Sequence, residues 1–210
     1  MNAKQKSILL LGDLIIPLFG YYSLDWSLYF IALYYLLDIL GLVIFYQIKA
    51  RQRLKFINQE KENKTHIKQS FLFVGLSVAI GVLVHLFSSQ IYPGINFSKE
   101  FVDFLMYEEE MFPFPQVYVL LPLVLLPQYQ LYKMEFLQFA KYRKNNIKDI
   151  AESQILSLVS AVILLFILFI ISTLITLDEK IWLFLFLTLE ILYKYLFNIK
   201  GRKHFLLTRK

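Results

Sequence analysis

Long runs of hydrophobic residues, separated by short polar segments, dominate the chain. A bilayer with a hydrocarbon core of about 30 Å is crossed by about 20 apolar helical residues. Six stretches reach or approach that length, at residues 7–22, 27–48, 69–92, 117–134, 154–177 and 181–198. The pattern predicts an all-α, polytopic integral membrane protein with about six transmembrane helices in a single domain, 1–210. The short stretches 7–22, 117–134 and 181–198 also fit re-entrant or interfacial elements.

The distribution of Lys and Arg predicts an orientation for these helices. Of the 22 basic residues, 20 precede the first stretch, follow the second or the fourth, or close the chain. The other two, Lys99 and Lys180, lie in the remaining connections together with eight acidic residues. Because basic loops stay on the cytoplasmic side, both termini are expected to be cytoplasmic. Basic segments flank the first helical pair, so 7–22 must cross if 27–48 does.

The composition narrows the possible partners. A chain with 58% hydrophobic and only 18% charged residues does not suit a water-soluble protein. The net charge of +6 would suggest nucleic acid in a soluble protein, but here it follows from the basic loops. Those loops predict attraction to anionic lipid on the cytosolic face rather than to nucleic acid. With no cysteine and three scattered histidines, the sequence predicts no metal, no cofactor and no catalytic motif.

The longest connection on the non-cytoplasmic side, residues 93–116, contains a predicted helix that does not cross the membrane. Ser98 can cap a helix in which apolar residues recur at three- and four-residue spacing, which is typical of an interfacial helix. An acidic triplet follows, formed by Glu108, Glu109 and Glu110. The triplet is interpreted as a solvated loop, with cation binding as the alternative.

Ionisable residues inside the apolar stretches are the default candidates for function, because charge at bilayer depth is costly. They are Asp13, Asp38, His85 and Glu190. One hypothesis brings the first three together in a proton or cation path, and the other assigns them to hydrogen bonds between helices. Glu190 stands one helical turn before Lys194, an orientation that favours an ion pair.

Prolines mark possible breaks in two of the predicted helices. Pro17 cannot donate a hydrogen bond to the carbonyl of Asp13. Pro122 and Pro127 lie five residues apart in 117–134 and remove two further ladder bonds. Broken helices mark binding sites in many transporters, whereas a bent structural helix is the simpler interpretation.

The first helical hairpin resembles a family of small bacterial polytopic membrane proteins known only as a domain of unknown function. The resemblance is carried by Pro17-Leu18-Phe19-Gly20, by Trp26, and by the run Leu33-Tyr34-Tyr35-Leu36-Leu37-Asp38. In this chain Tyr35 takes the place of a family Trp and Leu37 that of a family Glu. The resemblance implies a bacterial cytoplasmic (inner) membrane protein and implies no activity.

Three hypotheses of function follow. The first is a non-enzymatic membrane subunit or sensor that acts by assembling with itself or with partner proteins, as indicated by a small and polar stripe, Ser77, Gly81 and His85, in 69–92. The second is a small proton- or cation-coupled transporter or channel that uses the buried carboxylates. The third is an intramembrane or lipid-modifying enzyme with His85 or Glu190 as its acid or base.

Overall fold

The computed structural model describes residues 3–57, 60–106, 115 and 117–190, and within these ranges it contains helices and turns but no β-strand. The all-α prediction is therefore confirmed for the described part of the chain. The elements are α1 (Ala3–Ser23), α2 (Leu28–Ile57), α3 (Glu60–Ile91), α4 (Phe97–Met106), α5 (Val117–Leu131), the π-helical segment η1 (Tyr132–Leu137), α6 (Lys141–Lys144) and α7 (Ile147–Leu174). Residues 179–190 are also helical.

Three of the described helices, α2, α3 and α7, are long and apolar enough to cross a membrane. Helix α5 is shorter, with 15 residues. A helix of 30 residues such as α2 is about 45 Å long, so it extends beyond a hydrocarbon core of about 30 Å. These lengths and compositions suggest a membrane protein.

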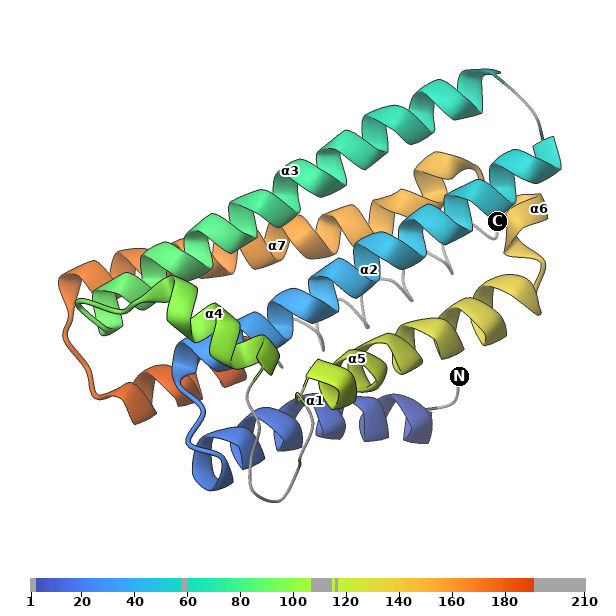
Figure 1. Cartoon of the computed structure of the whole chain (residues 1–210). Coiled ribbons are helices and arrows are strands. Elements are labelled where there is room, and N and C mark those ends of the chain that lie inside the picture. The colour runs from blue at the N-terminus through green and yellow to red at the C-terminus, as the bar shows by residue number, and fades with distance from the viewer. Residues whose placement is uncertain (1–2, 58–59, 107–114, 116, 191–210) are drawn as a thin grey trace.

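Helix α2 occupies the centre of the bundle and contacts every other named element (Figure 1). Every residue from Leu28 to Tyr35 is buried. The most extensive pairing between two other helices joins α3 to α7. Residues 179–190 pack against this core, since the ring of Phe186 lies 5.6 Å from that of Tyr35 and the ring of Trp182 lies 5.6 Å from that of Phe87.

Several helices extend beyond the apolar stretches that revealed them. Helix α2 continues to Ile57 and α3 begins at Glu60, so the basic segment between the two stretches is mostly helical. Helix α7 begins at Ile147, not near residue 154, because Asn146 and Asp149 form a capping box in which each side chain accepts a backbone N–H. Asn96, rather than Ser98, caps α4 by accepting the N–H of Lys99 at 3.1 Å.

The prolines do not break their helices. Helix α1 runs through the buried Pro17, and α5 runs through Pro122 and Pro127. The regular α-helix ends after Leu131, where η1 begins. At Pro122 and Pro127 each proline removes one ladder bond, but the neighbouring residues keep helical geometry and the irregular turn comes later.

Candidate functional site

His85, on α3, is held by contacts from two other helices. Its Nε2 lies 3.0 Å from the hydroxyl of Tyr29, and its Nδ1 lies 2.7 Å from the carbonyl oxygen of Gly81. A carbonyl only accepts, so Nδ1 carries a proton, and in the neutral ring Nε2 accepts from the tyrosine. The ring of Phe97, on α4, packs 4.8 Å from the imidazole and 5.1 Å from the tyrosine ring. The Nε2 contact thus joins α3 to α2, whereas the Nδ1 contact lies within α3 and fixes the orientation of the ring.

A second group of polar contacts surrounds the start of α2. The hydroxyl of Tyr92, just past the end of α3, accepts the N–H of Leu28 at 3.1 Å. Burial and a hydrogen bond to the Glu179 carboxylate raise the pKa of Tyr92. Ser27 accepts the N–H of Phe30 at 3.2 Å, as an N-cap residue does. The neutral Tyr92 hydroxyl therefore links α2 to both α3 and the helix of residues 179–190.

Asp38 lies on the side of α2 that faces α5. The side-chain amide of Gln128 donates to Asp38 Oδ1 at 3.3 Å. The helices can approach here because Gly41 has no side chain; a β-carbon at Gly41 would lie only 3.3 Å from Leu125 Cδ2. Asp38 is nine residues after Tyr29, which is two and a half turns and about 14 Å along the helix. Asp38 and His85 are therefore held on opposite sides of α2 and do not form one site.

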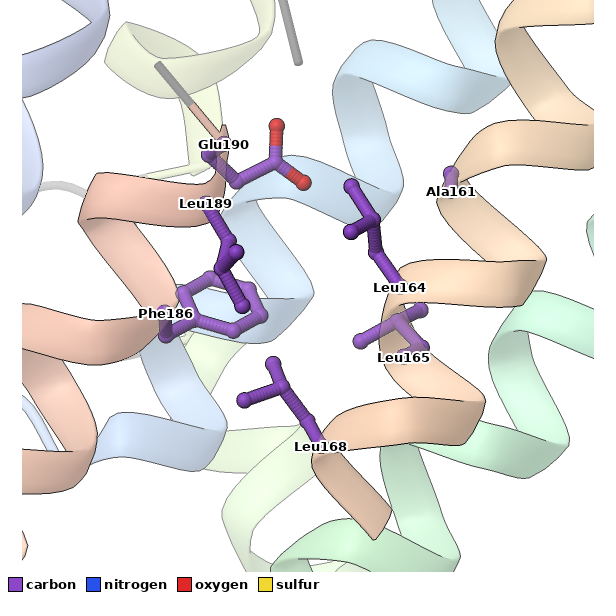
Figure 2. A pocket seen from close by; sticks show the side chains of 7 residues that line it. All are labelled: Ala161, Leu164, Leu165, Leu168, Phe186, Leu189 and Glu190. Carbon is purple, nitrogen blue, oxygen red and sulfur yellow. The ribbon is translucent and has the colours of Figure 1, made fainter. Parts of the chain in front are cut away.

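Glu190 borders an apolar recess between α7 and the helix of residues 179–190. Figure 2 shows its carboxylate directed toward α7, with the other lining side chains being Ala161, Leu164, Leu165, Leu168, Phe186 and Leu189. Residues 179–190 and α2 run in the same direction (Figure 1). Asp38 and Glu190 each lie about one turn beyond the Tyr35–Phe186 ring contact. The two carboxyl groups therefore share one depth in the bundle.

The remaining sequence candidates are placed only in part. Asp13 belongs to α1, whose backbone is described at that position while its side chain is not. Lys194 and the triplet Glu108–Glu110 lie outside the described residues. The predicted Glu190–Lys194 ion pair and cation binding by the triplet stay predictions.

A cluster around Arg53 is the main site that the sequence did not reveal. The side chain of Arg53 is only 9% exposed, and its Nη1 donates to the carbonyl oxygens of Tyr142 and Arg143 at 2.8 and 3.0 Å. Its Nη2 lies 3.6 Å from Glu62 Oε1, and Glu62 Oε2 accepts the N–H of Ile147 at 2.9 Å. One guanidinium and one carboxylate thus join the ends of α2, α3, α6 and α7.

A smaller polar network connects α2 and α3 nearer the bundle centre. Gln47 Oε1 lies 2.9 Å from His66 Nε2, which must be the donor because an amide oxygen only accepts. Gln47 Nε2 donates to Ser70 Oγ at 2.9 Å, and Ser70 in turn donates to the carbonyl oxygen of His66 at 2.9 Å. The buried ring of Tyr46 stacks beside His66. His66 therefore belongs to the contact between α2 and α3.

No family model, curated protein or solved structure matches this chain. The resemblance of the first hairpin therefore leads to no family assignment. Among the described residues, no three His, Asp or Glu side chains gather in a way that suits a metal ion. The polar groups instead form separate contacts between helices, spread along the length of α2, and the Arg53 cluster joins four of these helices.

Proposed function

We propose that the chain is a non-enzymatic integral membrane subunit or sensor that acts by assembling with a second copy of itself or with partner membrane proteins. The observation that carries this proposal is the way in which the partly buried polar groups are used. His85 bonds to Tyr29 on one side of α2, and Asp38 accepts from Gln128 on the other. Such contacts between helices fix a bundle without forming a reaction centre. His85 and Glu190 also lie at different depths, which disfavours an acid and base pair.

Helix α3 offers a surface for assembly. One side of it is apolar and exposed, and only 28% of its most apolar window is buried within the chain. The side chains that form this surface are Phe71, Val74, Val78 and Val82. Gly75 lies among them with no other heavy atom within 4 Å of where its β-carbon would stand. In a bilayer this side contacts either lipid or another helix, and Gly75 permits close approach of a helix.

The proposal includes six crossings with both termini cytoplasmic, in a bacterial cytoplasmic membrane. It is supported by the placement of the basic segments. The start of α1, the end of α2, the start of α3, α6 and the start of α7 all lie at one end of the bundle (Figure 1). The segments beside these ends hold most of the Lys and Arg residues, as expected for a cytoplasmic face. The bacterial assignment is supported by the resemblance of the first hairpin alone.

Cysteine cross-linking tests assembly directly, because the natural chain has no cysteine. Val78 is 60% exposed and Val84, on the same helix, is 3% exposed. We expect Val78→Cys to form a disulfide-linked dimer, or a cross-link to a partner, in native membranes under oxidation, and Val84→Cys to form neither. Gel mobility and native mass spectrometry from mild detergent provide the measurement. A lone monomer in both assays would contradict the proposal.

A proton- or cation-coupled transporter is the second candidate, favoured by one observation. Asp38 and Glu190 are both partly buried and each lies about one turn beyond the Tyr35–Phe186 contact, and carboxyl groups within a bilayer can hold a proton or a cation. If this function is correct, vesicles containing the protein should show a proton or cation flux that Asp38→Asn lowers at least about tenfold. Gln130→Glu, at an exposed position of α5, is the control and should leave the flux unchanged. An equal flux in the Asp38→Asn protein would remove Asp38 from the path.

A further inference from the structure

The corner around α6 presents cations and aromatic rings outward. Helix α6 is preceded by Ala140, whose φ of 48° is left-handed. Arg53 binds the carbonyl oxygens of Tyr142 and Arg143 from inside the bundle, so the polar backbone of this short helix is anchored there. The side chains of Arg143 and Lys144 are exposed. The fold therefore fixes a basic pair on the surface at this corner.

Arg143 has aromatic neighbours. The guanidinium of Arg143 lies 5.7 Å from the ring centre of Phe56 and 5.6 Å from that of Tyr142. The two ion pairs found in the described part of the chain, Arg53–Glu62 and Lys64–Glu60, involve neither Arg143 nor Lys144. Stacking on a ring leaves the edge of a guanidinium available for a bidentate contact with phosphate.

Two exposed phenylalanines belong to the same corner: Phe56 lies beside Arg143, and Phe139 precedes α6 by two residues. Phe139 is 65% exposed and Phe56 is 52% exposed. A large apolar ring beside a cation is typical of a protein segment at the membrane interface, where the ring enters the acyl boundary and the cation meets headgroups. An exposed phenylalanine would have no such advantage at a surface that faces only water.

The corner also stands at the depth of the lipid headgroups. The apolar stretch of α2 ends at Ile48, and Arg53 follows it by five residues, or about 8 Å along the helix. Each headgroup layer extends about 5–8 Å beyond the hydrocarbon core. Arg53 holds α6 directly. Arg143 and Lys144 are therefore within reach of lipid phosphates.

We propose that the corner formed by Phe56, Phe139, Arg143 and Lys144 is a binding site for the headgroup of an anionic phospholipid. The phosphodiester bonds to the guanidinium of Arg143, Lys144 adds a second cation, and Phe139 enters the interface beside the acyl chains. We choose a lipid as the occupant because its negative charge complements the two cations and because the corner lies at the depth of the headgroups. The site is independent of assembly, because it lies on α6 and the end of α2 and not on the exposed side of α3.

The test compares lipid retention by the full chain and its variants. The protein is placed in nanodiscs of equal phosphatidylglycerol and phosphatidylcholine, and the lipids that stay bound are identified by native mass spectrometry. We expect the natural chain to retain phosphatidylglycerol about tenfold over phosphatidylcholine, and Arg143→Gln/Lys144→Gln to bring the ratio close to one. The control Lys61→Gln/Lys64→Gln, exposed cations of α3, should keep the ratio. Phe139→Ser should lower it without a change of charge.

Three outcomes would overturn the proposal. A ratio preserved in Arg143→Gln/Lys144→Gln would show that the corner does not bind the headgroup. An equal loss in the Lys61→Gln/Lys64→Gln control would show diffuse attraction to the whole basic face. Displacement of the lipid by excess inorganic phosphate would assign the corner to a soluble anion. Thermal melting of each variant, followed by circular dichroism, should match that of the natural chain, because the substituted side chains are exposed.

Discussion

Replacing Arg53 with methionine is expected to lower the free energy of unfolding by about 3–5 kcal/mol, the usual cost of removing one partner from a buried ion pair. The guanidinium supplies both hydrogen bonds to the α6 carbonyl oxygens and the contact with Glu62. Methionine fills much of the same volume but donates nothing. Two carbonyl groups and a carboxylate would then remain without their cation. Thermal or denaturant unfolding in detergent, followed by circular dichroism, measures the change.

Two further variants separate the role of Arg53 from a general loss of positive charge. Arg51 is exposed and lies two residues away on α2, so Arg51→Met should change stability by less than about 0.5 kcal/mol. Glu62→Gln keeps an acceptor for the N–H of Ile147 but loses the charge, so we expect an intermediate effect. Equal stability of the Arg53→Met and Arg51→Met proteins would contradict the assignment of Arg53 as the residue that joins these helix ends.

Hydrophobic runs predicted the existence of the helices better than their limits. A run such as 27–48 marks the part of a helix that lipid or the protein core surrounds. The hydrophobic pattern gives no signal for the part of the same helix that lies in water. Helix α2 continues to Ile57 and α3 begins at Glu60 because their polar ends consist largely of good helix formers. The Glu60–Lys64 pair, one turn apart at 2.8 Å, adds a small stabilisation. The capping box of Asn146 and Asp149 sets the start of α7, and a hydrophobic run does not include such polar residues.

The residues of the candidate site were likewise predictable only in part. Residue type alone identified Asp38 and His85 as buried polar groups, because a charge in an apolar run is costly wherever it lies. Their partners, Gln128 and Tyr29, depend on how distant helices pack, and one sequence does not contain that information.

We interpreted Arg53 only as a signal of membrane topology. Within a basic segment, the sequence does not distinguish a cation that extends to the membrane surface from one that is buried in the protein. The available clue was its position on one helical face with Tyr46, Ala50 and Ile57. Tyr46 and Ala50 are fully buried.

The first hairpin leads to the second large prediction, at Gly20. A β-carbon at this position would overlap the ring of Trp26. The ring cannot easily withdraw, because the N–H of Trp26 donates to the carbonyl oxygen of Gly20 at 3.0 Å. The indole is 5% exposed and packs 5.0 Å from the ring of Phe30. Asp25, with a φ of 49°, adopts the left-handed conformation in the turn between α1 and α2.

We therefore expect Gly20→Ala to lower the free energy of unfolding by about 1–3 kcal/mol, as overpacking usually does, and to displace α1 from α2. Gly75→Ala is the matched control, since nothing beyond its chain neighbours and its own helix backbone lies within 4 Å of the added carbon, and alanine favours a helix by up to about 1 kcal/mol. Trp26→Leu should relieve the clash, so Gly20→Ala should cost less in that background than in the natural chain. Thermal melts of the four proteins measure this coupling. If Gly20→Ala and Gly75→Ala melt alike, then Gly20 is not the close-contact point of the hairpin.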